Sequence, residues 1–145
     1  MEASEDDIRV RRGRRSDVPR VRALLPAADG PARERFDRRT FASLAGDVYV
    51  AKAPGGTIVG VVSVSYLRSL AEGRFAAVLD AARATAGSRG LLDRLIAFAE
   101  TRARRRGCRR LAAWVDPADA TLRAALASRG YRTGELFVTE LDGVR

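Results

Sequence analysis

The feature of this sequence that most constrains its fold is a run of small and polar residues at 84–90, which joins a predicted strand to a long amphipathic helix. Residues 74–79 have the composition of a strand. A helix that follows a strand through a short turn packs back onto the sheet, so this unit predicts an α/β fold. Beyond the turn, the apolar residues that recur at helical spacing are Leu91, Leu92, Leu95, Ile96, Phe98, Ala99 and Ala103.

Strand and helix signals alternate along the rest of the chain. A turn of Pro, two Gly and Thr at 54–57 separates two Val-rich stretches, which we expect to pair as antiparallel strands. The order β-α-α-β-β-β-α-β-α-β predicts α/β architecture, with a single-domain mixed β-sheet flanked by helices. The predicted strands are 8–11, 47–52, 58–66, 74–79, 111–115 and 136–141. One predicted helix begins at Ser16 or Asp17, and three further helices cover 32–44, 91–107 and 117–128.

Length and composition exclude several classes of protein. The 145 residues fit one domain, which we expect to span 8–145 behind a disordered acidic tail at 1–7. The sequence has no apolar run of the roughly 20 residues that a membrane helix needs, and no apolar leader near its start. The single cysteine, Cys108, cannot form a disulfide within the chain, which argues against a disulfide scaffold. With no histidine as well, a metal site is disfavoured and a histidine base is excluded. These features predict a cytoplasmic protein.

The net charge of +9 predicts attraction to anions such as nucleic acids, phosphorylated cofactors and acidic partners. A nucleic-acid surface usually adds aromatic stacking platforms or a recognition helix, and the sequence shows neither. The sequence therefore disfavours a nucleic-acid partner. The two arginine clusters, at 9–22 and 102–110, are also explained as solvated helix faces and strand ends.

The turn at 84–90 has the properties of an anion site. The first amides of a helix have no internal partner, and the helix dipole adds positive charge there. Small side chains let a diphosphate approach the main chain, and Arg83 and Arg89 add charge. A tight turn with Ser88 as helix cap explains the same residues without a ligand. Neither a P-loop nor the Gly-x-Gly-x-x-Gly dinucleotide fingerprint fits this segment.

The stretch 78–92, VLDAARATAGSRGLL, resembles the signature of the GNAT superfamily of acetyl-CoA-dependent N-acetyltransferases. That signature is Arg or Gln, two residues, Gly, one residue and then Gly or Ala, followed by a Leu-Leu helix. Arg83 matches the first position, and Ala86 and Ser88 stand at the two small positions. In element order the resemblance extends over about 8–141, and it implies a GNAT-like acyl-CoA acyltransferase fold.

The resemblance also implies acetyl-CoA as cosubstrate, without a metal, and divides the site between several segments. Residues 76–78 would pair with the pantetheine arm, and the main chain of 84–89 would hold the pyrophosphate. Asp119 falls where the family often has an Asn near the cofactor. An amine substrate would enter from the opposite side, and a homodimer is expected at family level. The implied cofactor-binding residues are Ala76, Ala77, Val78, Arg83, Ala84, Thr85, Ala86, Gly87, Ser88, Arg89 and Asp119.

The family's usual catalytic side chains are not at their usual positions, so the catalytic residues stay unassigned. Arg74 and Phe75 occupy the region where members often have a Glu base, and Leu126 stands where they often have a Tyr acid. The sequence offers three substitutes without placing them: Glu72, Tyr66 and Tyr131.

Of three functions considered on the sequence, we predict the first, and the other two are its alternatives. The first is an acyltransferase that moves an acetyl group from acetyl-CoA to a primary amine of an unidentified substrate by direct attack. The second is a catalytically inactive GNAT-like module that binds acyl-CoA in a regulatory or interaction role. The third is a basic nucleic-acid-binding domain, which predicts affinity that falls steeply with salt and no stabilisation by CoA.

Overall fold

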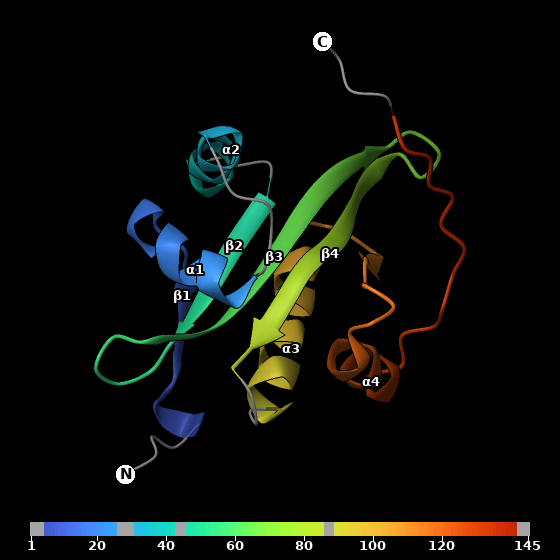
Figure 1. Ribbon diagram of the computed structural model, residues 1–145. Helices are drawn as coiled ribbons and strands as arrows, with labels where there is room; N and C mark the ends of the chain where they lie inside the picture. Colours follow the sequence, from blue (N-terminus) through green and yellow to red (C-terminus); the bar gives the residue numbers. More distant parts are fainter. Residues whose placement is uncertain (1–4, 26–30, 43–45, 86–88, 142–145) are drawn as a thin grey trace.

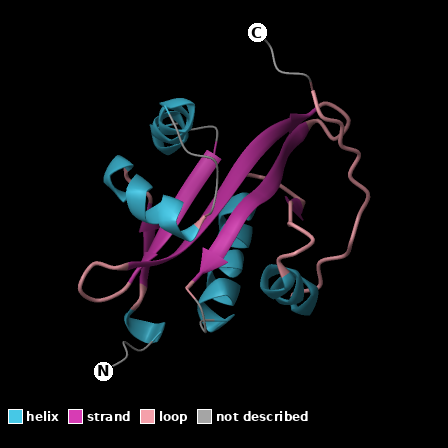
Figure 2. Cartoon of the chain, viewed as in Figure 1, coloured by secondary structure: helices cyan, strands magenta, loops and turns pink. Residues whose placement is uncertain are grey.

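The computed structural model describes residues 5–25, 31–42, 46–85 and 89–141 (Figure 1). The described helices and strands are η1 (Glu5–Asp7), β1 (Arg9–Arg12), η2 (Arg15–Asp17), α1 (Val18–Leu24), α2 (Pro31–Ala42), β2 (Gly46–Lys52), β3 (Ile58–Ser69), β4 (Arg74–Ala84), α3 (Arg89–Arg105), β5 (Leu111–Ala113) and α4 (Ala120–Ser128), where η marks a 3-10 helix. Figure 2 shows the same chain coloured by secondary structure.

The strands form one sheet in the order β1-β2-β3-β4-β5. The pairs β1–β2, β2–β3 and β3–β4 are antiparallel, whereas β4 and β5 are parallel. Antiparallel neighbours can be joined by short turns, but a parallel pair needs a crossover connection, which here contains α3. The sheet therefore combines hairpins at its N-terminal side with a β-α-β unit made of β4, α3 and β5.

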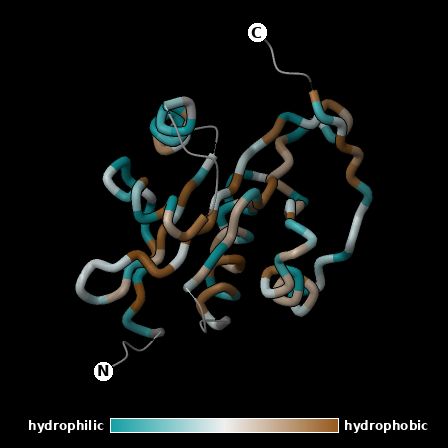
Figure 3. The backbone as a smooth tube through the Cα atoms, in the orientation of Figure 1, coloured by the Kyte–Doolittle hydropathy of each residue, from teal (hydrophilic) through white to brown (hydrophobic). Residues whose placement is uncertain are grey.

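Apolar side chains pack on both faces of the sheet. The larger cluster lies between the sheet and helices α3 and α4, and it contains Leu79, Leu95 and Leu126. The smaller cluster joins α1 to the opposite face and contains Val21 and Val61. Each fully buried side chain of this kind contributes about 1.5–3 kcal/mol. Figure 3 shows these apolar residues along the strands and α3, and it also shows apolar residues on the C-terminal segment outside the sheet.

The predicted fold class is confirmed, and most of the differences concern the ends of the elements. β3 and β4 continue well beyond the predicted 58–66 and 74–79, because they pair with each other from Gly60 opposite Ala84 to Ser69 opposite Arg74. The last helix begins at Ala120 rather than at 117. Such lengths depend on the pairing partner, which local sequence patterns do not specify.

The predicted last strand at 136–141 is wrong, because these residues have no strand structure. Their alternation of apolar and polar residues suits a strand, but a strand also needs a neighbour to pair with. Of the predicted tail at 1–7, residues 5–7 form η1 and residues 1–4 lie outside the described part of the chain.

No helix among the described residues is long and apolar enough to span a bilayer. Within those same residues, no group of three or more His, Cys, Asp and Glu side chains could hold a metal ion. Cys108 is a buried free thiol, and burial raises its pKa, so its environment disfavours the reactive thiolate.

Candidate active site

The parallel strands β4 and β5 stay together over only three residue pairs, from Ala77 opposite Leu111 to Leu79 opposite Ala113. The Trp114 amide makes a further bond to the Leu79 carbonyl, with an N–O distance of 3.1 Å. β4 continues to Ala84 and pairs there with β3 alone among the strands of the described chain. The main chain of β4 after Leu79 therefore forms an open edge where β5 has left the sheet.

A β-bulge lies at the beginning of this open edge. Leu79 is opposite Val64, and Ala81 is opposite Ser63, so Asp80 is an extra residue in β4. A bulge bends its strand and redirects side chains, and bulges are frequent beside active sites. Here the bulge coincides with the point at which β5 separates from β4.

Asp80 faces the side of the sheet that carries α1. Val61 belongs to the cluster under α1, and strand residues two apart share a face, so Ser63 lies on that face as well. The Ser63 hydroxyl donates a hydrogen bond to the Asp80 carboxylate. Although the residue as a whole is exposed, partial burial of its carboxylate raises the Asp80 pKa, and the Ser63 bond opposes this effect only in part. Asp80 is thus a more basic carboxylate than an ordinary aspartate.

Asp80 is the residue that sequence reasoning missed. The predicted strand ends at Leu79, which leaves Asp80 outside it. The available signal was a single carboxylate within an otherwise apolar stretch, FAAVLDAA at 75–82. Only the pairing of β3 with β4 shows that the stretch is one strand and that Asp80 is its bulged residue.

Arg83 and Asp119, two of the predicted cofactor residues, lie together at the far end of β4. The Arg83 guanidinium is 4.0 Å from the Asp119 carboxylate, and both side chains are partly exposed. Asp119 also caps α4 by accepting a hydrogen bond of 3.0 Å from the Leu122 amide. The pair joins the end of β4 to the beginning of α4.

The structure describes part of the predicted pyrophosphate loop. Ala84 ends β4, and the Thr85 amide donates to the Val59 carbonyl at 2.8 Å, so this amide is already used within the sheet. Ala86, Gly87 and Ser88 lie outside the described residues, as does the side chain of Arg89. The helix α3 begins at Arg89, so the positive end of its dipole lies at that first turn.

The predicted pantetheine strand, Ala76 to Val78, lies within the sheet rather than at its open edge. Ala77 is opposite Tyr66 of β3 on one side and Leu111 of β5 on the other. The Ala77 amide donates to the Arg110 carbonyl at 3.3 Å. The β4 residues with a free edge begin at Asp80.

The three substitute catalytic residues each have a partner elsewhere. Glu72, in the β3–β4 turn, is 3.6 Å from Arg110. Tyr66 donates to Asp47 at 2.7 Å, and Tyr131 donates to Glu100 at 2.9 Å.

Burial raises the pKa of both tyrosines, and the neighbouring carboxylates raise it further. Both hydroxyls are therefore weak acids near neutral pH. Leu126, at the position where the family often has tyrosine, is buried in the core.

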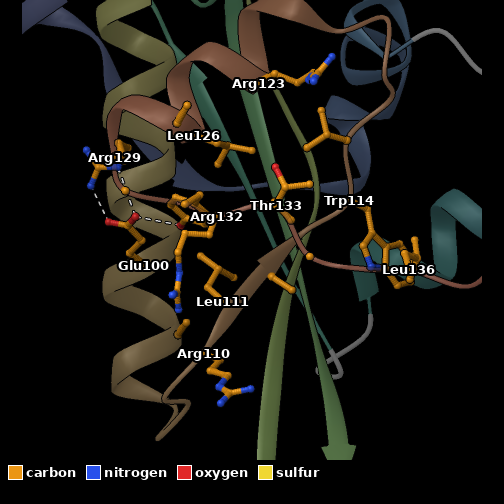
Figure 4. Close-up of a pocket in the computed structure, with 18 of the residues that line it drawn as sticks. Glu100, Arg110, Leu111, Trp114, Arg123, Leu126, Arg129, Arg132, Thr133 and Leu136 are labelled. Carbon is orange, nitrogen blue, oxygen red and sulfur yellow. Dashed lines mark hydrogen bonds and ion pairs between the residues drawn. The ribbon is translucent and has the colours of Figure 1, made fainter.

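A cavity of about 1660 Å³ opens beside β5 and α4 (Figure 4). It is lined by β5, α4, the end of α3 and the segment after α4, and Trp114 and Leu136 lie at one end of it. No described residue of β4 lines it. The cavity is therefore separate from the open edge that carries Asp80.

Comparison with known proteins gives a family match and many similar folds. The profile of the Acetyltransferase (GNAT) family matches residues 18–131. The aminoglycoside antibiotic 6'-N-acetyltransferase AAC(6')-Ih from Acinetobacter baumannii is similar with a TM-score of 0.76 and 14% identity, over 94% of this chain and 99% of that one. A comparison with curated proteins found no match.

Two further solved structures are similar to the same extent. The ribosomal-protein-alanine N-acetyltransferase from Brucella melitensis biovar Abortus 2308 has a TM-score of 0.75 and 16% identity, over 92% of this chain and 99% of that one. The aminoglycoside N-acetyltransferase AAC(6')-Iy in complex with CoA has a TM-score of 0.78 and 15% identity, over 98% of this chain and 97% of that one. At these identities the likeness shows the fold, and it leaves the acceptor unassigned.

Proposed function

Because the chain belongs to the GNAT acetyltransferase family, we propose that it transfers the acetyl group of acetyl-CoA to a primary amine, with Asp80 as the general base. The observation that carries the proposal is the open edge of β4, which begins at the bulged residue Asp80 where β5 leaves the sheet. It provides main-chain hydrogen-bonding groups and a basic carboxylate at the same place.

The open edge fits the pantetheine arm of acetyl-CoA. The arm carries two amides, which can pair with a free strand edge as another strand would. The residues that follow Asp80 are Ala81, Ala82, Arg83 and Ala84, so three of the four side chains are small. We therefore propose that residues 80–84, rather than Ala76–Val78, contact the pantetheine arm.

The phosphate end would lie beyond Ala84. The first amides of a helix have no partner within the helix and lie at the positive end of its dipole; α3 begins here, and Arg83 adds a cation. Residues 84–89 remain our proposed diphosphate contact, except that the Thr85 amide is bonded to Val59. Asp119 would influence the cofactor through Arg83.

The acceptor would approach from the face that carries α1 and α2, because Asp80 lies on that face. Acetyl-CoA supplies the activated acetyl thioester. Asp80 accepts a proton from the amine nitrogen as the new N–C bond forms, and the C–S bond breaks to release the thiolate, which takes up a proton from solvent. A base works best when its pKa lies near the working pH, so the raised pKa of Asp80 suits this role.

Calorimetric titration with CoA and acetyl-CoA, followed by mass spectrometry of a panel of amines, tests the proposal. We expect CoA to bind and to raise the thermal midpoint, since a ligand at a hundred times its dissociation constant stabilises a protein by about 2.7 kcal/mol. We also expect acetylated product from at least one amine. Binding without product from any amine would favour the inactive module, and a lack of CoA binding would refute the proposal.

A further inference from the structure

Trp114, the only tryptophan of the chain, directly follows β5. The side chains of Leu111, Ala113 and Val115 pack against the cluster between the sheet and helices α3 and α4. Because successive side chains of a strand point to opposite faces, Ala112 and Trp114 point to the face that carries α1. Their exposure alternates in the same way, since Ala112 and Trp114 are exposed and the other three are partly buried. Trp114 therefore lies on the side from which we propose that the acceptor approaches.

The register of β4 and β5 places Trp114 beside Asp80. Leu79 is opposite Ala113, and the Trp114 amide donates to the Leu79 carbonyl at 3.1 Å. The next residue along β4 is Asp80, and the next residue after Ala113 is Trp114. Neighbouring strands of a sheet lie about 4.8 Å apart, so the Asp80 and Trp114 side chains begin from adjoining backbone on the same face.

The indole ring of Trp114 has no polar or aromatic partner within the described part of the chain. It is 53% exposed, whereas the arginine–ring contacts of that part lie over Tyr49 and Tyr66. Leu136 lies beside Trp114 at one end of the cavity and is 66% exposed itself (Figure 4). Trp114 thus lies at the boundary between that cavity and the open edge of β4, with much of its ring available to a ligand.

We propose that the indole face of Trp114 and the carboxylate of Asp80 together bind the acceptor as an aliphatic ammonium ion, and that Trp114 determines which amines are accepted. The face of an indole ring attracts cations, and a carboxylate beside it attracts the same group. A dedicated cation site is needed because the net charge of +9 repels a cationic acceptor. The role in catalysis rests on the proposed acetyl transfer, but the cation site is measurable without turnover.

The residues around Trp114 favour an ammonium group that is carried on an apolar stem. Ala77 and Leu79 belong to the cluster on the α3 side, so Val78 between them lies on the same face as Trp114. Val78 is opposite Ala112 of β5, which is exposed on that face. An alkyl chain that extends from the ammonium group therefore meets apolar side chains, and it has no buried polar group to leave unpaired.

The two arginines that flank this stretch of the sheet each have an acidic neighbour. The Arg83 guanidinium, in β4, is 4.0 Å from the Asp119 carboxylate. The Arg110 guanidinium, directly before β5, is 3.6 Å from the Glu72 carboxylate. Each carboxylate offsets part of the positive field that its arginine would otherwise impose on a bound cation.

The first test uses tryptophan fluorescence, which reports on Trp114 alone. The full chain is titrated with tetramethylammonium chloride, which cannot be acetylated, and with sodium chloride at the same ionic strength. tert-Butyl alcohol serves as an uncharged probe of similar size. We expect a saturable change of fluorescence with tetramethylammonium only. A lack of saturation, or an equal response to the alcohol, would overturn the proposal.

The second test asks whether Asp80 belongs to the same site as Trp114. Asp80→Asn removes the charge beside the ring, and Asp7→Asn removes the same charge from η1. A unit charge about 4 Å away contributes about 1 kcal/mol in water, so we expect Asp80→Asn to raise the tetramethylammonium dissociation constant about fivefold. Asp7→Asn should change it less than twofold. Equal effects of the two substitutions would show that Asp80 does not contribute to the cation site.

The third test separates recognition of the cation from apolar packing. Trp114→Phe keeps an aromatic face, whereas Trp114→Leu keeps only apolar bulk. With butylamine as acceptor, we expect Trp114→Leu to raise the amine KM about fivefold, with a smaller rise in Trp114→Phe. The KM for acetyl-CoA should stay the same, and kcat should change less than the amine KM. Circular dichroism of both variants checks that they fold.

Equal amine KM values in the two variants, or a fall in kcat alone, would contradict a role of Trp114 in binding the cation. Tetramethylammonium should also inhibit competitively against butylamine and not against acetyl-CoA. The proposed acetyl transfer and the cation site fail separately. A chain that acetylates no amine refutes the transfer, while the fluorescence titration still decides whether Trp114 binds a cation.

Discussion

Two aspartates on the same sheet, Asp47 and Asp80, have opposite surroundings. Asp47, in β2, is fully buried and accepts hydrogen bonds from Tyr66 at 2.7 Å, Arg106 at 3.1 Å and Arg12 at 3.3 Å. Asp80 is exposed as a residue and bulges from β4, and its carboxylate accepts hydrogen bonds from the Ser63 hydroxyl and from its own backbone amide. The partners of Asp47 come from β1, β3 and the end of α3, so this carboxylate joins separate elements.

The difference shows how surroundings decide whether a carboxylate stabilises the fold or is free for chemistry. A buried carboxylate with several donors is held in one place, which suits a structural role. A carboxylate that is partly desolvated and has few donors keeps a raised pKa and can exchange a proton. If this contrast is correct, changes at the two positions should affect different measurements.

The largest expected effect is the loss of turnover in Asp80→Asn. An amide of the same shape still accepts a hydrogen bond from Ser63 but cannot take a proton. We expect kcat to fall about 10²- to 10⁴-fold, the range typical of a lost general base. Rates with the acceptor amine, together with thermal melting, are the measurements, and an unchanged kcat would remove Asp80 from the mechanism.

The stability of Asp80→Asn should not fall. The folded-state pKa of Asp80 is raised, so its contribution to stability is present below the ordinary aspartate pKa and is lost as pH rises through the raised value. An amide avoids this loss, so at neutral pH the variant should be equally or more stable. Ser63→Ala is the companion change, because it removes a bond that lowers the Asp80 pKa. It should move the acid limb of the pH–rate profile to higher pH.

The next effect in size is on stability, in Asp47→Ala. The change leaves the arginines around Asp47 without their common partner. Removal of one member of a buried ion pair typically costs about 3–5 kcal/mol, and we expect about 2–3 kcal/mol here because these arginines reach solvent. Urea unfolding measures the loss, and kcat per folded molecule should stay unchanged. A variant of full stability would show that the Asp47 cluster does not hold the elements together.

Sequence reasoning predicted the fold class because periodicity and turn residues mark elements locally. The Pro-Gly-Gly turn joins β2 and β3, and the Leu-rich helix after 84–90 is α3. The same reasoning was wrong at 136–141, where the pattern suits a strand but supplies no neighbour. Local patterns therefore identified elements better than pairings.

The residues of the candidate site were likewise predicted only in part. The resemblance selected Arg83 and Asp119, and the structure brings these two side chains within 4.0 Å of each other. It did not show where β5 leaves β4 or that Asp80 is bulged, because both depend on the register between strands far apart in the chain. The partners of Tyr66 and Tyr131 were also beyond local patterns, since they lie 19 and 31 residues away in sequence.

Asp119→Asn tests the ion pair between Asp119 and Arg83. This pair is partly exposed, so its surroundings are intermediate between those of buried Asp47 and exposed Asp80. Asn keeps the side-chain oxygen that caps α4 but removes the charge beside Arg83. Exposed ion pairs are worth about 0.2–1 kcal/mol, so release of Arg83 should tighten CoA binding by no more than about fivefold. Calorimetric titration measures the change. Weaker binding would mean that Asp119 serves the coenzyme in another way than through Arg83, and Asp119→Ala, which also loses the cap, is the stability control.

An effect of similar small size separates a structural tyrosine from a catalytic one. Tyr131→Phe removes the hydroxyl that donates to Glu100, and we expect a loss of about 1 kcal/mol of stability with unchanged kcat. Burial alone would raise the Glu100 pKa, but hydrogen bonds from Arg129 and Tyr131 bring it below the ordinary value. The contribution of the ionised Glu100 carboxylate to stability is present above the ordinary glutamate pKa and is lost as pH falls through the lowered value. The difference in stability between the unmodified protein and Tyr131→Phe should therefore narrow in acid. Urea unfolding at neutral and acidic pH measures the gap. If Tyr131→Phe instead abolishes turnover at full stability, Tyr131 is the proton donor. In that case the number of hydrogen-bond partners around a side chain does not distinguish a structural role from a catalytic role in this protein.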